Sequence, residues 1–449
     1  MTRDSKLPLL MVDGGGLLFE RVPPSPRELE QARVAAEGLV AGYNQIGYAA
    51  VGVAGRDLAG GLDFLKAQAD RAKFAWLSAN LVEPGSDKPL FTPYLSRKLG
   101  ETRLAIIGLT SEQADPALLQ GASIKPWGET LARLVPELAR NHDFLVLLTD
   151  LPPTVCGTLA QQYPAINLII NAFGEAYNQP PRALTPSTLL AATGRQGKYV
   201  GGLEITWSRG GRWGEGESRF LALRDKEAEL QRTSRLLAEV AKQPGQESQS
   251  GNLRRRQGLL QEEIDELSSG LAGVPAAFFA STFTAMAATV GEEPQVAALV
   301  AQVRERIGER GRKHAQAAGE AGASALPEFT GWRACAPCHP QAAARWQSTG
   351  HSAAYLTLEK KNRQFDVNCL ICHVTGGEVV PTDRMAVLPP EFHGVGCEVC
   401  HGPGRRHAEG KEKNRPRRVA VTLCQGCHAP EHDGDFDYGR DVERIRCDR

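Results

Sequence analysis

The sequence has few aromatic residues, almost no cysteine in its first three quarters and no excess of either charge. Lysine plus arginine and aspartate plus glutamate both total 52, which removes the electrostatic basis of a general nucleic-acid-binding protein. A membrane-spanning helix needs about 20 consecutive apolar residues. The nearest candidate, residues 272–290, is interrupted by Pro275, Ser281 and three threonines. We therefore expect no nucleic-acid partner and no transmembrane segment in this chain.

The chain does have an ordinary globular composition and enough length for two or three domains. Of its 449 residues, 42% are hydrophobic and 23% are charged. Residues 7–207 alternate between apolar runs of strand length and stretches of helical period, which predicts an α/β layered domain. The expected strands are Pro8–Val12, Ala49–Val53, Phe74–Leu77, Leu104–Leu109, Phe144–Thr149 and Leu168–Ile170, and the expected helices include Ser25–Ile46, Leu62–Ala72 and Trp127–Ala139.

The segment that follows is predicted to form a helical hairpin at about residues 222–271. Leucines recur at helical spacing on both sides of a polar stretch, residues 243–252, which contains one proline and two glycines. A strand at Phe278–Met286 and a helix at Glu293–Ala315 are expected next. The predicted domains are 1–318 for the α/β domain, 319–330 for an alanine- and glycine-rich linker, and 331–449 for a second domain.

Nine of the ten cysteines lie beyond residue 334, and eight of them form four Cys-x-x-Cys pairs that are each followed directly by histidine. In c-type haem attachment, both thiols bond to the porphyrin and the next residue can ligate the iron through its imidazole. Structural zinc sites and redox dithiols do not require that histidine. The pattern therefore predicts four haem c groups. The attaching cysteines are Cys335, Cys338, Cys369, Cys372, Cys397, Cys400, Cys424 and Cys427, and the proximal iron ligands are His339, His373, His401 and His428.

Four further histidines lie in the same segment outside the motifs, namely His351, His393, His407 and His432. Four spare imidazoles for four haems indicate bis-histidine ligation, and these residues are the candidate distal ligands. Iron that is saturated in this way suits electron transfer rather than substrate binding.

Three strings of the C-terminal part are distinctive: Trp346 to Ala354, Asn368 to Gly376 and Gly396 to His407. On these strings, residues 331–449 resemble the cytochrome c554 family of multihaem cytochromes. The resemblance implies a mainly α, loop-rich tetrahaem domain in which closely stacked haems pass electrons along a chain. It also supports His351 and His407 as distal ligands.

The chain departs from that family's pattern near its end, where a Phe-Asp-Tyr-like string is usually followed by a histidine. Phe436, Asp437 and Tyr438 are present, but Cys447 stands near the expected place of the histidine. Three outcomes stay open for the haem concerned: ligation by His432, ligation by the Cys447 thiolate, or an open position. We favour His432, because imidazole is the usual partner in closely spaced transfer haems.

Framework strings in the first part carry a second resemblance: Leu10 to Gly16, Ala50 to Leu58, Leu77 to Leu81, Leu104 to Thr110 and Gly197 to Gly201. Over roughly residues 7–310, the chain is similar to the metallophosphatase domain of 5′-nucleotidases. That family binds two metals through an Asp-x-Gly-Asp string, an Asn-His pair and later histidines.

Most of these metal ligands are replaced in this chain. Gly16 stands where the second aspartate would be, Arg56-Asp57 replaces Asn-His, Asp150 replaces a histidine, and Phe173 and Glu175 replace the two histidines of Gly-His-x-His. Carboxylates and imidazoles must converge for a hard di-metal site. Four acids remain, so weak cation binding stays open: Asp13, Asp57, Asp150 and Glu175. We nevertheless expect no phosphoesterase activity and assign no catalytic residue.

Together these features predict a multihaem cytochrome that carries electrons between extracytoplasmic redox partners, either other cytochromes or quinol-linked donors. The nucleotidase-like domain would serve docking or assembly, and homo-oligomerisation stays open. Two alternatives remain: a haem reductase of a small nitrogen or sulfur oxyanion with one open haem, and a ligand-sensing pseudophosphatase. Haem attachment of this kind requires export, yet residues 1–6 have no apolar leader segment. We expect a periplasmic or cell-surface location, with the signal removed or upstream of a misassigned start.

Overall fold

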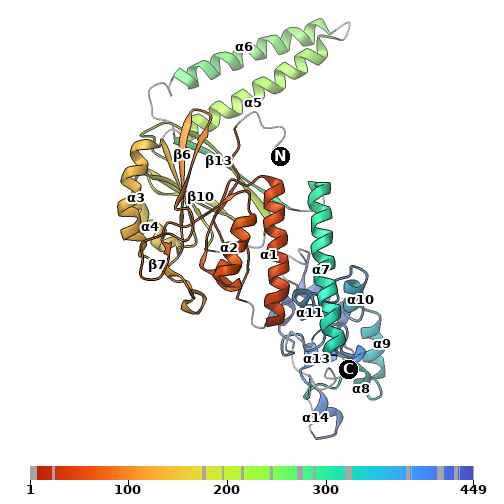
Figure 1. Ribbon diagram of the computed structural model, residues 1–449. Coiled ribbons are helices and arrows are strands. Elements are labelled where there is room, and N and C mark those ends of the chain that lie inside the picture. Colours follow the sequence, from red (N-terminus) through yellow and green to blue (C-terminus); the bar gives the residue numbers. More distant parts are fainter. Residues whose placement is uncertain are drawn as a thin grey trace. The chain divides into compact units, whose positions relative to one another are not determined.

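The computed structural model describes residues 8–22, 26–173, 178–194, 197–213, 217–242, 246–269, 277–286, 290–318, 326–380, 385, 387–411, 419–428, 433 and 435–447. The chain divides into two compact units (Figure 1). The first comprises residues 1–20 and 47–290, and the second comprises residues 21–46 and 291–449.

The described part of the first unit contains four sheets, two of which have more than two strands. Three parallel strands, β1 (Val12–Asp13), β2 (Ala50–Gly52) and β3 (Ala75–Leu77), form the smaller sheet. The larger sheet contains β5 (Tyr94–Leu99), β6 (Thr102–Leu109), β8 (Phe144–Thr149), β9 (Ile166–Asn171), β10 (Gln179–Thr185) and β11 (Thr188–Ala192). Its strand order is β10-β11-β9-β8-β6-β5, with parallel pairing from β11 to β6 and antiparallel strands at both edges.

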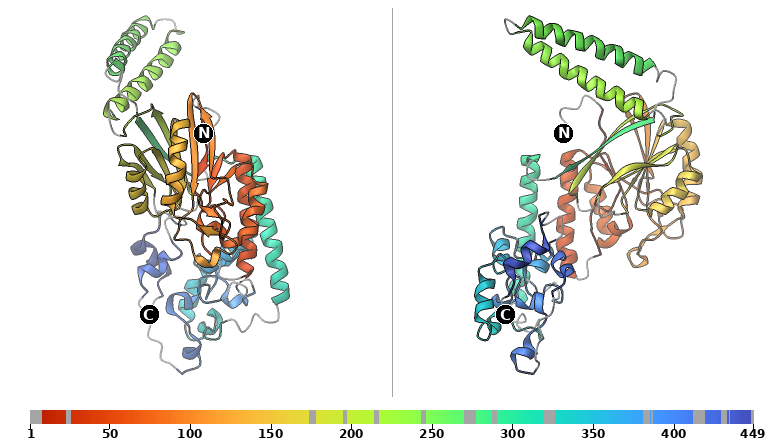
Figure 2. Two further views of the ribbon diagram at one scale, coloured as in Figure 1. Left: turned by 60° about the vertical axis from the view of Figure 1, so that its left-hand side comes forward. Right: turned by 180° about the vertical axis from the view of Figure 1, so that it is seen from behind.

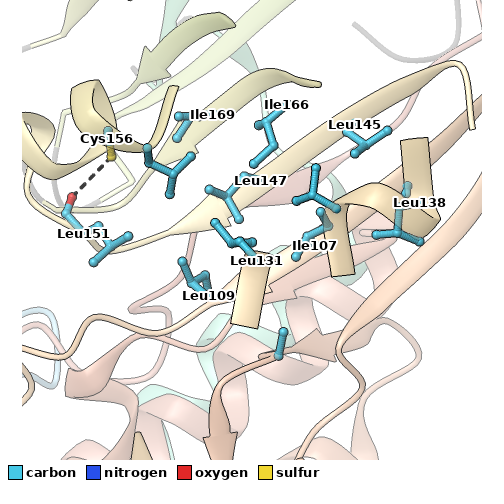
Figure 3. Close-up of a cluster of buried hydrophobic side chains, with 14 of the residues drawn as sticks. Ile107, Leu109, Leu131, Leu138, Leu145, Leu147, Leu151, Cys156, Ile166 and Ile169 are labelled. Carbon is cyan, nitrogen blue, oxygen red and sulfur yellow. Dashed lines mark hydrogen bonds between the residues drawn. The ribbon is translucent and has the colours of Figure 1, made fainter. Parts of the chain in front are cut away.

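The strand β8 shows why its sequence is continuously apolar: all six of its residues are buried. Leu145 and Leu147 point to a core that also contains Leu131 of α3 (Trp127–Asn141) and Cys156 of α4 (Pro153–Gln162), as Figure 3 shows. The alternate residues of β8 join a second core with residues of β2 and β3. A sheet covered on both faces is typical of α/β proteins with parallel strands.

Two long antiparallel strands, β12 (Tyr199–Trp207) and β13 (Ala277–Ala285), pair over their whole length. Between them the chain forms a helical hairpin of α5 (Glu217–Val240) and α6 (Glu247–Ser269), which run side by side in Figures 1 and 2. The predicted hairpin is thus confirmed. Smaller elements of this unit are α2 (Leu62–Arg71), β4 (Leu81–Val82), β7 (Ser123–Ile124) and two 3-10 helices, Gly55–Gly60 and Pro116–Leu118.

The second unit contains two long helices, α1 (Pro26–Ile46) and α7 (Pro294–Ala318), which lie side by side (Figures 1 and 2). Gly38 permits their close approach, because a Cβ at this position would lie 2.5 Å from Cγ2 of Val303. The remainder of this unit is helical with loops. Its short helices are α8 (Trp332–Cys335), α9 (Pro340–Gln347), α10 (Ala354–Glu359), α11 (Val367–His373), α13 (Cys397–His401), α14 (Arg405–Ala408), α15 (Val421–Gln425), α16 (Tyr438–Ile445) and a 3-10 turn at Pro390–Phe392.

The expected α/β layered fold of the first part and the helical, loop-rich fold of the second are confirmed. The division into compact units falls at other points than residues 318 and 331, because α1 and α7 pack on each other and group with the C-terminal part. None of the helices that the structure describes combines the length and apolar character needed to cross a bilayer.

Candidate functional site

The four Cys-x-x-Cys-His motifs lie on or beside short helices, and the structure brings their cysteines together in pairs. The Cys335 thiol at the end of α8 hydrogen bonds with that of Cys397 on α13, which raises the pKa of Cys335 and lowers the pKa of Cys397 to about 7. The Cys372 thiol on α11 hydrogen bonds in the same way with Cys427 beside α15. The first motif is therefore adjacent to the third, and the second is adjacent to the fourth.

One candidate distal ligand lies opposite the proximal histidine of the first motif. The ring centroids of His339 and His407 are 6.3 Å apart, and the ring planes are inclined by 30°. Two metal–imidazole bonds of about 2 Å each place the centroids of a bridging pair roughly 6 Å apart. The two imidazoles therefore have the spacing that a single iron between them requires.

A second pair has the same arrangement at the fourth motif. The ring centroids of His351 and His428 are 5.9 Å apart, with an interplanar angle of 49°. Burial, followed by the proximity of His428, lowers the pKa of His351. A lowered pKa keeps this imidazole neutral at pH 7, which is the state that binds a metal.

The second motif has a different environment. His373 donates through Nδ1 to the carbonyl of Ala354 at 2.7 Å, which leaves Nε2 available for iron. His393, the remaining described candidate, stacks on Tyr355 with centroids 3.7 Å apart and donates through Nε2 to the carbonyl of Leu388 at 3.0 Å. In this position its Nε2 is engaged by the protein.

The third motif has no equivalent histidine pair among the described residues. The pKa of His401 is lowered by burial and then by His339, so these two proximal imidazoles are near each other. His432 lies outside the described residues. Cys447 is exposed. The pKa of Cys400 is raised to about 11, first by burial, then by the nearby thiol of Cys424 and then by that of Cys447.

A buried carboxylate that the sequence did not single out connects these elements. Glu398, between the cysteines of the third motif, accepts hydrogen bonds from the backbone N–H groups of Thr330, Gly331 and Gly404 at 2.7–2.9 Å. Gly331 precedes α8 of the first motif, and Gly404 precedes α14, which carries His407. An acid between two attachment cysteines next to glycine-rich loops was the only signal that could have indicated this role.

The residues present fit the chemistry of haem c. Each described motif supplies two thiols and an imidazole, and two further imidazoles face motif histidines at iron-bridging distance. A cavity of about 270 Å³ lies against the fourth motif, lined by Glu378, Ala420, Thr422, Leu423 and Gly426. The C-terminal part also has a small apolar core of its own between α10, α11 and the loops around them.

In the first unit, the residues that replace the family's metal ligands form a closed network. Asp57 is fully buried and accepts hydrogen bonds from the backbone N–H groups of Gly16, Leu18 and Ala54, each at 2.9 Å. Its pKa is nevertheless raised to about 6, because burial outweighs these three N–H groups and the Arg56 charge. Asp150 accepts from the N–H groups of Gly55 and Ser111, and burial raises its pKa too.

The Arg56 side chain explains why two substitutions occur together. Its guanidinium donates to the carbonyls of Gly16, Ala172 and Gly15 at 3.3–3.5 Å. A Cβ at Gly16 would collide with the Arg56 guanidinium, so a side chain at position 16 would have to displace the guanidinium from its present place. A cation supplied by the chain itself therefore lies among the carbonyls and buried acids of this centre.

The remaining candidates at this centre are dispersed or outside the described residues. Asp13 accepts from the N–H of Gly15 at 2.9 Å, Phe173 is exposed, and Glu175 lies outside the described part. Within the residues that the structure describes, no three histidine, cysteine, aspartate or glutamate side chains are grouped to hold a metal ion.

Comparison with known proteins agrees with this division. Residues 334–402 match the family described as "Cytochrome c554 and c-prime". Over 128 residues the chain is 32% identical to cytochrome c-554 of Nitrosomonas europaea, which covers 23% of this chain and 54% of that protein. Over 143 residues it is 38% identical to a 5′-nucleotidase of Vibrio parahaemolyticus, which covers 30% of this chain and 24% of that enzyme.

Among solved structures, a 5′-nucleotidase precursor of Thermus thermophilus aligns with a TM-score of 0.37 and 20% identity, over 46% of this chain and 44% of that one. The chain spans about half the length of the curated cytochrome and a quarter of the curated nucleotidase. Its C-terminal part is similar to cytochromes c554, and its N-terminal part is similar to the metallophosphatase domain of 5′-nucleotidases.

Proposed function

We propose that this protein is a tetrahaem c-type cytochrome that carries electrons between redox partner proteins outside the cytoplasm. The observation that carries the proposal is the pair of imidazole couples, His339 with His407 and His351 with His428, each at the separation of two ligands on one iron. Similarity to a cytochrome c554 supports a multihaem electron carrier, and the four motifs set the proposed number of haems at four.

Each haem would be held by the two cysteines of one motif and by the histidine that follows them. When bound, haem c supplies an iron that takes up and releases one electron. The chain's own contribution is to fix the ring orientation: Nδ1 of His373 is held by a backbone carbonyl, and Nδ1 of His428 by a carboxylate. The remaining nitrogen of each ring would thereby be the one that ligates the iron.

We propose that the nucleotidase-like unit is catalytically inactive and serves docking or assembly. Two metals need several anionic or neutral ligands with free lone pairs. Here the carboxylates of Asp57 and Asp150 already accept backbone N–H groups, and the Arg56 guanidinium lies among them. This unit keeps the sheets of the fold although the metal ligands are replaced. Its surface could therefore still bind a partner protein or a second copy of the chain.

The location and partners follow from the same chemistry. Covalent attachment of haem to Cys-x-x-Cys-His takes place after export, so the protein is proposed to act in the periplasm or at the cell surface. Its partners there would be other cytochromes or quinol-linked donors.

One observation favours a second candidate function, a haem reductase of a small nitrogen or sulfur oxyanion. Nε2 of His393 is bonded to the carbonyl of Leu388 and its ring stacks on Tyr355. With His393 held in this way, a haem without a sixth protein ligand would be open to a substrate.

Two measurements on the mature protein test the proposal. Denaturing mass spectrometry should show the polypeptide plus four haem masses, and bound zinc or fewer haems would overturn the proposal. The spectrum of the oxidised protein should then show only low-spin iron. One high-spin iron that binds the oxyanion and is reoxidised by it would support the reductase instead.

A further inference from the structure

The imidazole of His428 has a contact that sets the fourth motif apart. Its Nδ1 donates a hydrogen bond to Oδ2 of Asp433 at 2.7 Å. Phe436 stacks on the same ring with centroids 4.7 Å apart and planes inclined by 18°. With Nδ1 engaged by the carboxylate, Nε2 is the nitrogen that would ligate the iron of a bound haem.

His373 of the second motif provides the comparison. Its Nδ1 also donates at 2.7 Å, but to the backbone carbonyl of Ala354, which is a neutral acceptor. The two motifs are adjacent, because Cys372 and Cys427 share a hydrogen bond. Two neighbouring haems would therefore have proximal imidazoles that both donate through Nδ1, but to acceptors of different charge.

The charge of the acceptor changes how strongly an imidazole donates to a metal. A carboxylate on Nδ1 pulls the proton toward itself, which makes the ring more like an imidazolate and a stronger ligand. Stronger donation stabilises ferric iron relative to ferrous iron, and the reduction potential falls. The Asp433 side chain is 41% exposed, so water screens its charge over distance, but the hydrogen bond acts through direct contact.

We propose that Asp433 is a positioning residue that lowers the potential of the haem on Cys424 and Cys427, so that electrons pass from this haem to the neighbouring one on Cys369 and Cys372. This inference rests on the proposed electron-carrier function. It adds a direction of transfer that neither the number of motifs nor the histidine pairs supply.

The test is a spectroelectrochemical titration of the full-length mature protein, with Asp433→Asn compared against Asp435→Asn. The asparagine of the first variant keeps an oxygen acceptor for Nδ1 but removes the charge. Asp435 is a nearby exposed carboxylate, so its substitution by asparagine removes one charge from the same stretch of chain. We expect Asp433→Asn to raise the midpoint potential of one haem, and Asp435→Asn to leave all potentials unchanged.

A His351→Ala background identifies the haem concerned. Removal of the distal imidazole should make that iron high-spin, and the potential shift caused by Asp433→Asn should then belong to the high-spin haem. Unchanged potentials in Asp433→Asn, equal shifts in both asparagine variants, or a shift in a different haem would each overturn the inference. A mature wild-type protein without four haem masses would overturn the proposed function itself, so the two failures are distinguishable.

Discussion

The carboxylate of Glu398 accepts a hydrogen bond from the backbone N–H of Gly404 at 2.7 Å, inside a region where Glu398 is only 4% exposed. The same carboxylate accepts the N–H of Gly331 at 2.8 Å. Gly404 leads into the helix of His407, and Gly331 leads into the helix of the first motif. One acid of the third motif thus fixes the starting points of the two segments that present His339 and His407.

We therefore expect Glu398→Gln to weaken distal ligation of the first haem. The glutamine NH₂ group cannot accept, so one of the three N–H groups loses its partner, at a cost of about 1–3 kcal/mol. The measurement is the high-spin fraction of the oxidised protein, which should rise by up to one haem and fall again when imidazole is added. Glu409→Gln is the matched control, because Glu409 pairs at the surface with Lys411. A spectrum identical to that of the wild type would contradict the role of Glu398.

Arg56→Gln should destabilise the first unit. The substitution releases the carbonyls of Gly15, Gly16 and Ala172 from the guanidinium, and it removes a positive charge whose field slightly lowers the pKa of Asp57 and Asp150. Leaving a buried acceptor without its donor costs about 1–3 kcal/mol, and partial exposure of Arg56 places the expected loss at the lower end. Hydrogen exchange of the β8 amides measures this loss of stability. Arg103→Gln, which breaks the solvent-exposed pair with Asp143, is the control and should change the exchange of these amides little.

The Asp57 carboxyl predicts an unusual pH dependence of this unit. Its pKa is about 6 in the folded state against an ordinary value of 3.8, so the folded state takes up the proton first as the pH falls. This tighter proton binding adds about 3 kcal/mol to the free energy of unfolding below pH 3.8. The added stability is lost as the pH rises through 6. The stability advantage of the wild type over Asp57→Asn, followed by β8 exchange, should therefore widen from pH 7 to pH 4.5. A narrowing difference would mean that the three N–H groups outweigh burial.

The first unit should hydrolyse no 5′-nucleotide or other phosphoester, even with added manganese or zinc. Its buried acids already accept backbone N–H groups, and Arg56 occupies the space beside Gly16. Release of phosphate by the purified full-length protein is the measurement. Turnover that disappears in Asp57→Ala would show that the altered centre still binds metals.

The sequence predicted those elements best whose burial is continuous or strictly periodic. The strand at Phe144–Thr149 has the expected bounds, because both of its faces are covered, and α1, α2 and α3 lie within two residues of their expected ranges. The edge strands β5 and β10 were not predicted, because their residues are largely exposed and carry no apolar run. β10 also contains two prolines, which sequence rules associate with turns.

The candidate sites show the same contrast. Attachment motifs are local in sequence, so Cys-x-x-Cys-His is visible without a structure. The hydrogen bond from Arg56 to the Gly16 carbonyl joins residues 40 positions apart in the sequence. The hydrogen bond from the Gly331 N–H to Glu398 joins residues 67 positions apart. Nothing in the local pattern at Gly16 or Gly331 reveals the partner, so these roles required the folded arrangement.

The last prediction concerns the haem whose distal ligand the sequence leaves open. We expect His432→Ala to convert one haem from low-spin to high-spin, because imidazole is the usual sixth ligand in closely spaced transfer haems. Cys447→Ser should leave the spectrum unchanged, because we expect this exposed thiol not to ligate an iron. His142→Ala is the control, because His142 is held by Ser96 and the carbonyl of Leu138 in the first unit. The opposite pattern, with Cys447→Ser altering one haem and His432→Ala none, would assign the thiolate instead. Such a ligand would lower the potential of that haem by pushing electron density onto iron.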